Sequence, residues 1–296
     1  MKILIIGGNG YIGSFLTKHL PFSTLSIGCR DNDYYSYSTD FFQSYEYIIL
    51  LAGHSSVQMC LGPLQGPWLN NVSNFKTLIE KTTPEQKIIY ASSSSVYGNK
   101  NTKIGTEDDL SLDYINNYDL TKSTLDLYAL QQINMGRSII GLRFGTVNGG
   151  SPVIRRDLMI NSMVYNALND GKIFVTNKHV HRPILFIKDL SKAIYTILKL
   201  EPSVGFASGI YNLASFNTTV DVISQEVSKQ TGIPVTELED KPGVYNFAIS
   251  SEKFKKTYSF NFEGTPESVV SHVLECYKYK KPNIVIRNEY FNYTRP

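Results

Sequence analysis

The beginning of the chain joins a short apolar run to a glycine-rich turn, and this combination restricts the fold more than any other feature. Residues 2–6 read Lys-Ile-Leu-Ile-Ile, and residues 7–13 read Gly-Gly-Asn-Gly-Tyr-Ile-Gly. An uninterrupted apolar run of this length predicts a strand that is buried on both faces of a parallel sheet. The glycines then predict a tight turn that leads directly into a helix, as at the start of a βαβ unit.

The spacing of the three glycines in this turn predicts a dinucleotide site. The helix expected from Tyr11 to about Leu20 begins at the turn, so its free N–H groups and partial positive charge face any phosphate bound there. Glycine also allows close approach of a pyrophosphate and close packing of helix on sheet. The alternative is a glycine turn that binds no nucleotide. The residues expected to bind the cofactor here are Gly7, Gly10, Tyr11, Ile12 and Gly13.

The end of the second predicted strand should select between NAD and NADP. This strand covers residues 25–29, and the chain continues through Arg30 and Asp31. An acid at this place accepts hydrogen bonds from a ribose 2′-hydroxyl, whereas an arginine accommodates a 2′-phosphate. A strand that ends at Cys29 makes Arg30 the selecting residue, and a longer strand gives that role to Asp31. The alternative is that both are solvated loop residues. We favour NADP, with NAD as the alternative.

Apolar runs alternate with helical patterns along the first half of the chain. The predicted strands cover residues 2–6, 25–29, 47–51, 87–91 and 138–142, and the predicted helices cover residues 11–20, 71–81 and 118–133. Such alternation implies βαβ units and an α/β fold of the Rossmann type, with a doubly wound parallel sheet.

The pattern changes after Phe144, where loops and polar segments become more frequent. We expect helices at 157–170, 189–200, 220–231 and 266–278, and strands at 183–187 and 210–213. We therefore predict an NAD(P)-binding domain in residues 1–150, with residues 182–214 returning to it. Residues 151–181 and 215–296 form a smaller, interleaved C-terminal lobe in this prediction, and we expect that lobe to bind the substrate.

Tyr118 and Lys122 form the most informative pair in the middle of the chain. They are four residues apart on a predicted helix, so they share one face. An ammonium group beside a phenol favours the phenolate and lowers the tyrosine pKa from its usual value of about 10. Tyr118 is then a candidate to donate and accept protons near neutral pH. A serine run, residues 92–95, ends the preceding strand.

Composition limits the class of protein. The 296 residues are 42% hydrophobic, which supports a sizeable core, and the net charge is only +3 without a long basic run. We therefore expect no nucleic-acid partner. Three cysteines without metal-ligand spacing are typical of reduced thiols in a cytoplasmic protein and predict no metal site. No apolar run approaches the length of a membrane span.

Taken together, these motifs resemble the extended short-chain dehydrogenase/reductase family, in its nucleotide-sugar epimerase, dehydratase and reductase branch. The resemblance runs from Met1 to about Val270. Its markers are Gly7 to Gly13, Leu50-Leu-Ala-Gly-His-Ser-Ser-Val57, Asn70-Asn-Val72, Ser92 to Gly98, Tyr118 with Lys122, Leu142-Arg-Phe144 and Arg182-Pro-Ile-Leu-Phe-Ile-Lys-Asp189.

The resemblance implies catalytic roles by position. Tyr118 corresponds to the family's acid/base, and Lys122 to the residue that lowers its pKa and bonds the nicotinamide ribose. Ser93 corresponds to the Ser or Thr that bonds the reacting oxygen, although its serine neighbours have the same chemistry. Ser94 is expected to contact the substrate. The family's 4,6-dehydratases carry an acid pair where this chain has Ser94 and Ser95, so dehydration is not expected.

The resemblance also implies binding roles. Ala52 and Gly53 correspond to a loop that lets the cofactor approach, and Asn70 to a residue that bonds near the cofactor, or alternatively to a helix N-cap. Asn161 and Arg182 correspond to positions that bind the diphosphate of a sugar nucleotide, a task that suits the planar fork of arginine. The alternative for Arg182 is a surface ion pair.

The implied activity is hydride transfer between the nicotinamide and a sugar carbon of a nucleotide-diphosphate sugar. Arg30 and the short stretch between the second and third strands favour a reductase that converts a 4-keto-6-deoxy-sugar nucleotide with NADPH. The alternative is a nucleotide-sugar 4-epimerase that keeps NAD bound. A non-catalytic nucleotide-binding protein is a third hypothesis, because a fold does not determine a function. The family also implies a homodimer.

Overall fold

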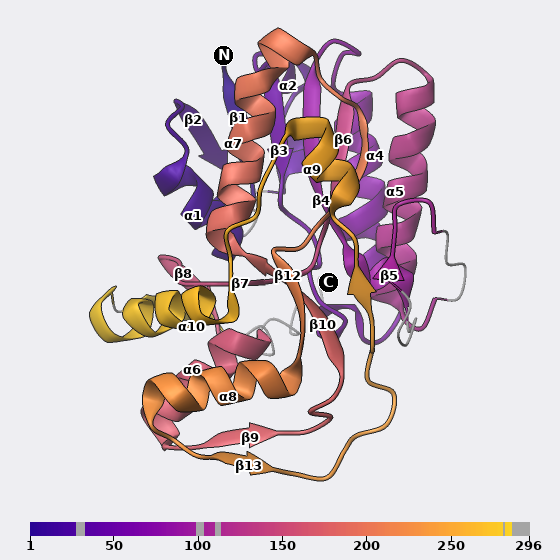
Figure 1. Cartoon of the computed structure of the whole chain (residues 1–296). Coiled ribbons are helices and arrows are strands. Elements are labelled where there is room, and N and C mark those ends of the chain that lie inside the picture. Colours follow the sequence, from indigo (N-terminus) through magenta and orange to yellow (C-terminus); the bar gives the residue numbers. More distant parts are fainter. Residues whose placement is uncertain (28–32, 99–103, 110–113, 281, 286–296) are drawn as a thin grey trace.

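The centre of the molecule is a six-stranded parallel sheet in the order β11-β6-β4-β3-β1-β2 (Figure 1). The computed structural model describes residues 1–27, 33–98, 104–109, 114–280 and 282–285. The strands are β1 (Ile3–Ile6), β2 (Thr24–Ile27), β3 (Tyr47–Leu50), β4 (Lys87–Ser93), β6 (Ile139–Phe144) and β11 (Gly209–Leu213). All five pairings are parallel, so the predicted Rossmann-type α/β fold is confirmed.

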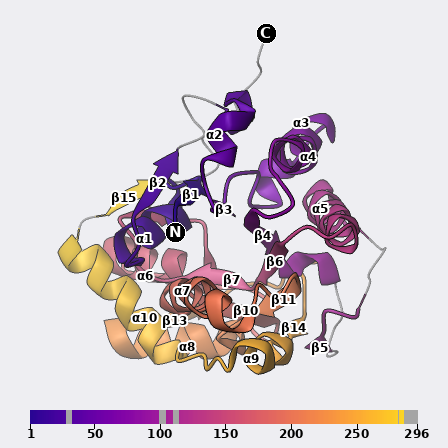
Figure 2. The same cartoon turned by 90° about the horizontal axis from the view of Figure 1, so that it is seen from above.

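Helices cover both faces of this sheet (Figure 2). Within β1, Ile3 and Ile5 join a core on one face, and Leu4 and Ile6 join a core on the other. Helices α1 (Tyr11–His19) and α7 (Ile187–Val204) cover the first face, and α4 (Asn74–Glu80) and α5 (Asn117–Asn134) cover the second. This double burial explains why the strands are continuous apolar runs instead of alternating patterns.

The direction of the winding changes between β1 and β3. From β1 the chain runs outward to the edge strand β2 and then returns to the other side of β1 as β3. In open parallel sheets, a ligand crevice lies outside the carboxyl ends of the strands at such a switch point. The turn that begins at Gly7 and the loop that begins at Leu51 leave the sheet there.

The helical segment before β4 begins earlier than the sequence predicts. It runs from α3 (Gln65–Trp68) through a π-helical turn (Leu69–Ser73) into α4, and every joining residue has helical backbone angles. Asn70 and Asn71 therefore lie inside one continuous helical segment. The alternative reading of Asn70 as an N-cap is wrong, because the helix does not begin there.

The remaining elements build several small sheets and helices beside the large sheet. The helices are α2 (Thr39–Gln43), α6 (Met159–Asp170), α8 (Val220–Thr231), α9 (Glu252–Tyr258) and α10 (Pro266–Glu275). The short strands are β5 (Ile104–Gly105), β7 (Thr146–Asn148), β8 (Val153–Arg155), β9 (Ile173–Val175), β10 (His181–Phe186), β12 (Phe216–Thr219), β13 (Val235–Glu237), β14 (Ala248–Ile249) and β15 (Asn283–Val285). Helices α6 and α8 and the pair β9–β13 lie below the large sheet in Figure 1.

Of the two strands expected between residues 182 and 214, only β11 joins the large sheet. Strand β10 instead pairs with β7 and β12 in a separate three-stranded sheet. The assignment of the C-terminal elements to substrate binding stays a prediction.

Apolar side chains are exposed along the segment that contains α3. They are Leu61, Leu64, Trp68 and Leu69, and Leu127 on α5 is exposed as well. This surface fits the helix contact expected in a homodimer, and the dimer stays a prediction. No helix among the described residues combines the length and apolar character needed to cross a membrane.

Candidate active site

The glycine turn leaves the N-terminus of α1 open to a ligand. Helix α1 has no side-chain cap at Gly10 and no acidic residue in its first turn. Its first N–H groups therefore have no partner from a capping side chain. Gly7 has a φ of +93°, and a Cβ there would lie 2.8 Å from the backbone nitrogen of Ala52. The turn after β1 and the loop after β3 are thus in close contact at the switch point.

Among the glycines of the turn, Gly13 has the closest contact with backbone atoms. A Cβ at this position would lie 2.2 Å from the carbonyl oxygen of Gly7 and 2.5 Å from the Cα of Gly8. Both atoms belong to the backbone of the turn, so they cannot move away without distorting it. This contact explains the third glycine of the motif as a packing requirement between helix and turn.

Replacement of Gly13 by Ala is expected to weaken binding of NAD or NADP by at least about tenfold and to destabilise the fold by about 1–3 kcal/mol, because the added methyl group pushes the turn apart. Titration calorimetry and thermal unfolding measure the two effects. Gly66→Ala is the matched control, since no atom lies within 4 Å of a Cβ placed there. Unchanged cofactor affinity in Gly13→Ala would contradict this account of the turn.

The loop after β3 is joined to helix α5 by Asn71, not by Asn70. The side chain of Asn71 is 2% exposed. Its amide oxygen accepts a hydrogen bond from the backbone nitrogen of His54 at 2.8 Å, and its nitrogen donates to Thr121 at 3.0 Å. The Asn70 side chain only donates to the carbonyl of Gly66, at 3.0 Å. Asn71 thus has a structural role, the joining of this loop to α5, that the sequence prediction missed.

The position of the Asn71 side chain leaves no room for a side chain at Gly53. Its φ is +135°, and a Cβ there would lie 2.7 Å from the amide oxygen of Asn71. Ala52 precedes it, and the Ala52 nitrogen donates to the carbonyl of Ile6 at 3.1 Å. The predicted cofactor residues Ala52 and Gly53 therefore lie at the switch point, and their contact with a cofactor stays a prediction.

The side chains of Tyr11 and Asn161 are hydrogen-bonded to each other in the interior of the protein. The Asn161 side chain has no exposed surface. Its nitrogen donates to the Tyr11 hydroxyl at 3.3 Å and to the carbonyl of Arg155 at 3.0 Å, and its oxygen accepts from the nitrogen of Gly149 at 3.2 Å. The Tyr11 hydroxyl donates to the carbonyl of Gly149 at 2.7 Å. Both donor hydrogens of the amide are used, so the prediction that Asn161 binds a substrate diphosphate needs correction.

Tyr118, Ser93 and Lys122 converge at the carboxyl end of β4. Helix α5 begins at the N-cap Asn116, and it places Tyr118 and Lys122 in its first two turns. Ser93 is the last residue of β4 and forms a side-chain hydrogen bond with Tyr118. The ammonium of Lys122 lies 6.0 Å from the centre of the Tyr118 ring and donates to the carbonyl of Ala91 at 2.9 Å. The three predicted catalytic residues thus lie together.

The pKa of Tyr118 differs from the sequence expectation. Burial raises it to about 12, and the hydrogen bond with Ser93 and the charge of Arg155 only partly oppose this rise. Burial lowers the pKa of Lys122 to about 8, against the opposing charge of Asp126. The expectation of a lowered tyrosine pKa is therefore wrong for the protein alone, because desolvation outweighs the charge of Arg155 and the hydrogen bond with Ser93.

A short helical turn, Ser94–Tyr97, follows Ser93 and fixes its hydroxyl. The Ser93 hydroxyl donates to the Ser95 hydroxyl at 3.0 Å and accepts from the Ser95 nitrogen at 3.2 Å. The Ser93 oxygen therefore keeps a defined direction at the end of the strand. Ser94 is buried in the same turn, and its contact with substrate stays a prediction.

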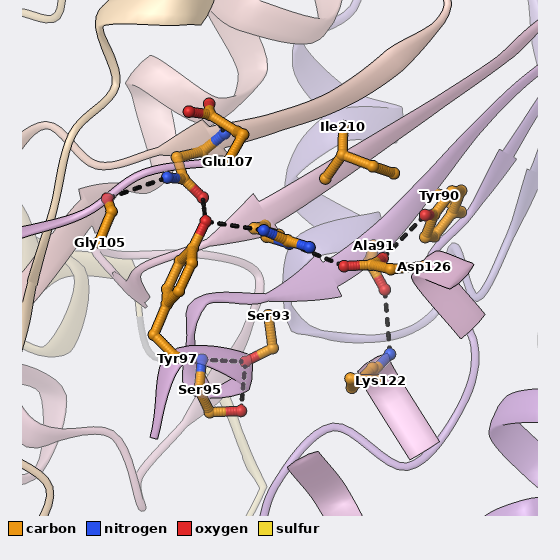
Figure 3. Close-up of polar contacts among 12 residues, drawn as sticks. Tyr90, Ala91, Ser93, Ser95, Tyr97, Gly105, Glu107, Lys122, Asp126 and Ile210 are labelled. Carbon is orange, nitrogen blue, oxygen red and sulfur yellow. Dashed lines mark hydrogen bonds and ion pairs between the residues drawn. The ribbon is translucent and has the colours of Figure 1, made fainter. Parts of the chain in front are cut away.

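A chain of buried polar side chains lies next to this site (Figure 3). Asp126 accepts from the Tyr90 hydroxyl at 2.8 Å and from Nε of Arg143 at 2.8 Å. Arg143 also donates to the Tyr97 hydroxyl at 2.8 Å, and that hydroxyl donates to Asn212 at 2.8 Å. The chain of bonds joins α5 and β6 to the turn that follows Ser93.

Arg182 lies on β10 without an acidic partner among the described residues. Its guanidinium donates to the carbonyl of His181 at 3.1 Å. Burial lowers its pKa to about 10. The alternative of a surface ion pair is therefore not what the structure shows. A partly buried guanidinium without a carboxylate partner suits an anionic ligand.

The residues expected to select the cofactor, Arg30 and Asp31, lie outside the described part of the chain, as does Cys29. The other two cysteines, Cys60 and Cys276, are buried and form no disulfide among the described residues. The preference between NAD and NADP therefore rests on sequence alone.

A comparison with protein families agrees with this geometry. Residues 3–214 match the model of the NAD dependent epimerase/dehydratase family. The chain belongs to this family. The matched region contains the glycine turn, the loop after β3, and Ser93, Tyr118 and Lys122, so the family match and the site coincide.

Curated relatives and solved structures are similar to the chain. Protein CapI of Staphylococcus aureus is 29% identical over 235 residues, which are 67% of this chain and 70% of CapI. MoeE5, solved with NAD and UDP-glucuronic acid, has a TM-score of 0.82 at 20% identity and covers 95% of this chain and 100% of its own. It was also solved with NAD and UDP-glucose.

UDP-glucuronic acid 4-epimerase from Bacillus cereus has a TM-score of 0.79 at 19% identity and covers 94% of this chain and 99% of its own. RMD from Pseudomonas aeruginosa, complexed with NADPH, has a TM-score of 0.78 at 16% identity and covers 94% and 99%. These likenesses show the fold, and such structural neighbours bind NAD or NADPH.

Proposed function

We propose that this protein transfers hydride between a nicotinamide cofactor and C4 of a nucleotide-diphosphate sugar, and that the outcome is 4-epimerisation. The observation that carries the proposal is the convergence of Tyr118, Ser93 and Lys122 beside the switch-point crevice. Membership of the epimerase/dehydratase family supports the reaction class. Serines at positions 94 and 95 argue against dehydration.

The residues around the crevice fit a dinucleotide. The uncapped start of α1 suits a pyrophosphate, and the close contact of Gly7 with Ala52 leaves no side chain between the two loops. Gly7, Gly10, Gly13 and the first N–H groups of α1 would hold the cofactor. When bound, the nicotinamide supplies the hydride acceptor and donor; the protein supplies orientation and proton transfer.

Proton transfer falls to Tyr118. Its phenol is mostly protonated at neutral pH because its pKa is about 12. In the oxidation half of the cycle, the small phenolate fraction accepts the proton of the sugar 4-hydroxyl as hydride leaves C4. The phenol then returns that proton to the ketone oxygen when hydride is delivered back to C4. Ser93 is placed to hold the same oxygen if its single hydroxyl proton, which points to Ser95 in the protein alone, turns to the substrate. Lys122 donates one hydrogen bond to the Ala91 carbonyl, and an ammonium group has three donors. Its other donors are therefore suited to the cofactor ribose.

Arg182 is proposed to bind the diphosphate of the substrate. It combines partial burial with a guanidinium that has no acidic partner among the described residues. We take uridine diphosphate as the first nucleotide to test, because MoeE5 was solved with UDP-sugars.

A second candidate is reduction of a 4-keto-6-deoxy-sugar nucleotide with NADPH. The protonated phenol of Tyr118 favours it, since ketone reduction requires a proton donor. The two candidates differ in their use of cofactor. A 4-epimerase regenerates its NAD in each cycle, whereas a reductase consumes NADPH.

The deciding experiment follows cofactor and sugar together. Purified protein is incubated with NAD and UDP-glucose, or with NADPH and a UDP-4-keto-6-deoxy sugar, and the products are separated by chromatography. Formation of UDP-galactose without net reduction of NAD supports the epimerase. Net loss of NADPH absorbance with the keto sugar supports the reductase. No change of either sugar would contradict hydride transfer on these substrates.

A further inference from the structure

A buried acid stands directly beside the proposed catalytic tyrosine. Asp119 is 1% exposed. Its Oδ2 accepts a hydrogen bond from Nδ2 of Asn116 at 3.0 Å and another from the hydroxyl of Tyr245. Both partners are donors, which suits a charged carboxylate, an acceptor-only group. Part of this arrangement is structural, because Asn116 and Asp119 cap the start of α5.

Tyr245 places this acid along the path that a sugar nucleotide must occupy. The proposed diphosphate ligand is Arg182, and the proposed reacting centre is Tyr118, so the sugar lies between them. Tyr245 interacts electrostatically with Arg182 on one side and with Tyr118 and Asp119 on the other. The Asp119 carboxylate is therefore one hydrogen bond away from a side chain that borders this path.

The second oxygen of Asp119 has no hydrogen bond of ordinary geometry with the described residues, although the Ser95 side chain lies near enough to Asp119 to favour its charged form. Oδ1 is buried and makes no hydrogen bond with them. Buried polar atoms are nearly always bonded, so an exception requires an explanation. Burial raises the pKa of Asp119, while Tyr245, Ser95 and Asn116 oppose the rise by favouring its charged form. An unbonded carboxylate oxygen next to a substrate path calls for a hydrogen-bond donor from the ligand.

The other charges near Tyr118 do not compensate for this acid. Arg155 is bound to Asp157 through both carboxylate oxygens, so that pair is neutral overall. Lys122 is directed to the Ala91 carbonyl at the end of β4. The negative charge of Asp119 therefore lies near Tyr118 without an ion pair to any cation among the described residues.

From this arrangement we infer that Asp119 determines specificity: it accepts a hydrogen bond from a hydroxyl or amino group of the sugar and excludes sugars that carry a carboxylate. The inference rests on the proposed function and names its substrate class as neutral or amino hexoses, not uronic acids. The C6 carboxylate of a uronate offers Asp119 Oδ1 only acceptor oxygens where a neutral hexose offers a hydroxyl, and like charges in a desolvated site repel each other.

The test compares UDP-glucose with UDP-glucuronic acid by titration calorimetry on protein saturated with NAD. We expect UDP-glucose to bind at least about tenfold more tightly, which corresponds to about 1.4 kcal/mol. In Asp119→Asn the ratio should fall at least about tenfold, because the variant removes the charge and places a donor at the Oδ1 position. Tyr245→Phe is the matched control, since it removes a hydroxyl and keeps the charge; it should retain the discrimination.

Equal or tighter binding of UDP-glucuronic acid by the natural protein would overturn the inference, and this result does not depend on how any variant folds. An unchanged ratio in a folded Asp119→Asn protein would overturn it as well. If UDP and both sugars fail to bind, the proposed function itself is wrong. If UDP binds and the two sugars bind equally well, only the role of Asp119 is wrong.

Discussion

Tyr118→Phe is expected to lower kcat by about 10²–10⁴-fold, the usual contribution of a positioned acid or base. The variant keeps the aromatic ring, which is 9% exposed, and removes only the hydroxyl that bonds Ser93. The affinity for NAD should stay nearly unchanged, because the glycine turn and the start of α1 are not altered. Steady-state kinetics and cofactor titration measure the two properties separately.

Tyr128→Phe serves as the control for this prediction. Tyr128 lies farther along the same helix and packs with the core near Phe75. Its loss of a hydroxyl should leave kcat unchanged. Full turnover in Tyr118→Phe would remove Tyr118 from the mechanism and leave the non-catalytic hypothesis as the better description.

Arg143→Met is expected to destabilise the protein by about 3–5 kcal/mol, because it leaves the carboxylate of Asp126 buried without its counter-ion. Asp126 and Arg143 are 1% and 5% exposed, and 2.8 Å separate Nε from Oδ2. Equilibrium unfolding in urea measures the loss. The same substitution should also lower activity, since Arg143 bonds Tyr97 in the turn that follows Ser93.

Neutralising both partners should recover most of this loss. In the double variant Asp126→Asn with Arg143→Met, no charge of the pair remains buried, and the introduced amide oxygen can still accept from the Tyr90 hydroxyl. Lys178→Met is a surface control: Lys178 pairs with Glu237 while 48% exposed, and exposed pairs contribute little. A double variant as unstable as Arg143→Met alone would show that the destabilisation does not come from the unpaired charge.

Local signals were sufficient to predict the Rossmann half of the fold. The run before Gly7 is apolar at every strand position because both faces of β1 are covered, and Gly13 is required by its contacts with the nearby Gly7 and Gly8. Tyr118 and Lys122 share a helix face through a spacing that the sequence displays directly. These features depend on neighbours along the chain, so they can be read without knowing the tertiary structure.

The missed features depend on long-range contacts. The sequence prediction assigned a role to Asn70 instead of Asn71. Asn71 lies on the buried side of the helical segment, and this becomes apparent only once the helix is known to start at Gln65. The other buried residues on that side include Pro67, Asn74, Phe75 and Leu78. Asn161 lies 150 residues from its partner Tyr11, so its burial could not be foreseen.

The pKa of Tyr118 was misjudged for the same reason. The four-residue spacing shows that a lysine is near Tyr118, but it does not show how far the fold removes Tyr118 from water. That desolvation has the larger effect on the tyrosine pKa. Asp119 was also overlooked, since its partner Tyr245 is 126 residues away.

The central claim is that hydride passes between sugar C4 and a nicotinamide held at the switch point. Its most direct test mixes NAD-saturated protein with UDP-glucose or UDP-galactose deuterated at C4, quenches the reaction, and determines the mass of the cofactor. The account predicts reduced cofactor that carries one deuterium, and a strong decrease of this label in Tyr118→Phe. If the sugar nucleotides bind but the natural protein transfers no deuterium from either one to the cofactor, the claim is contradicted.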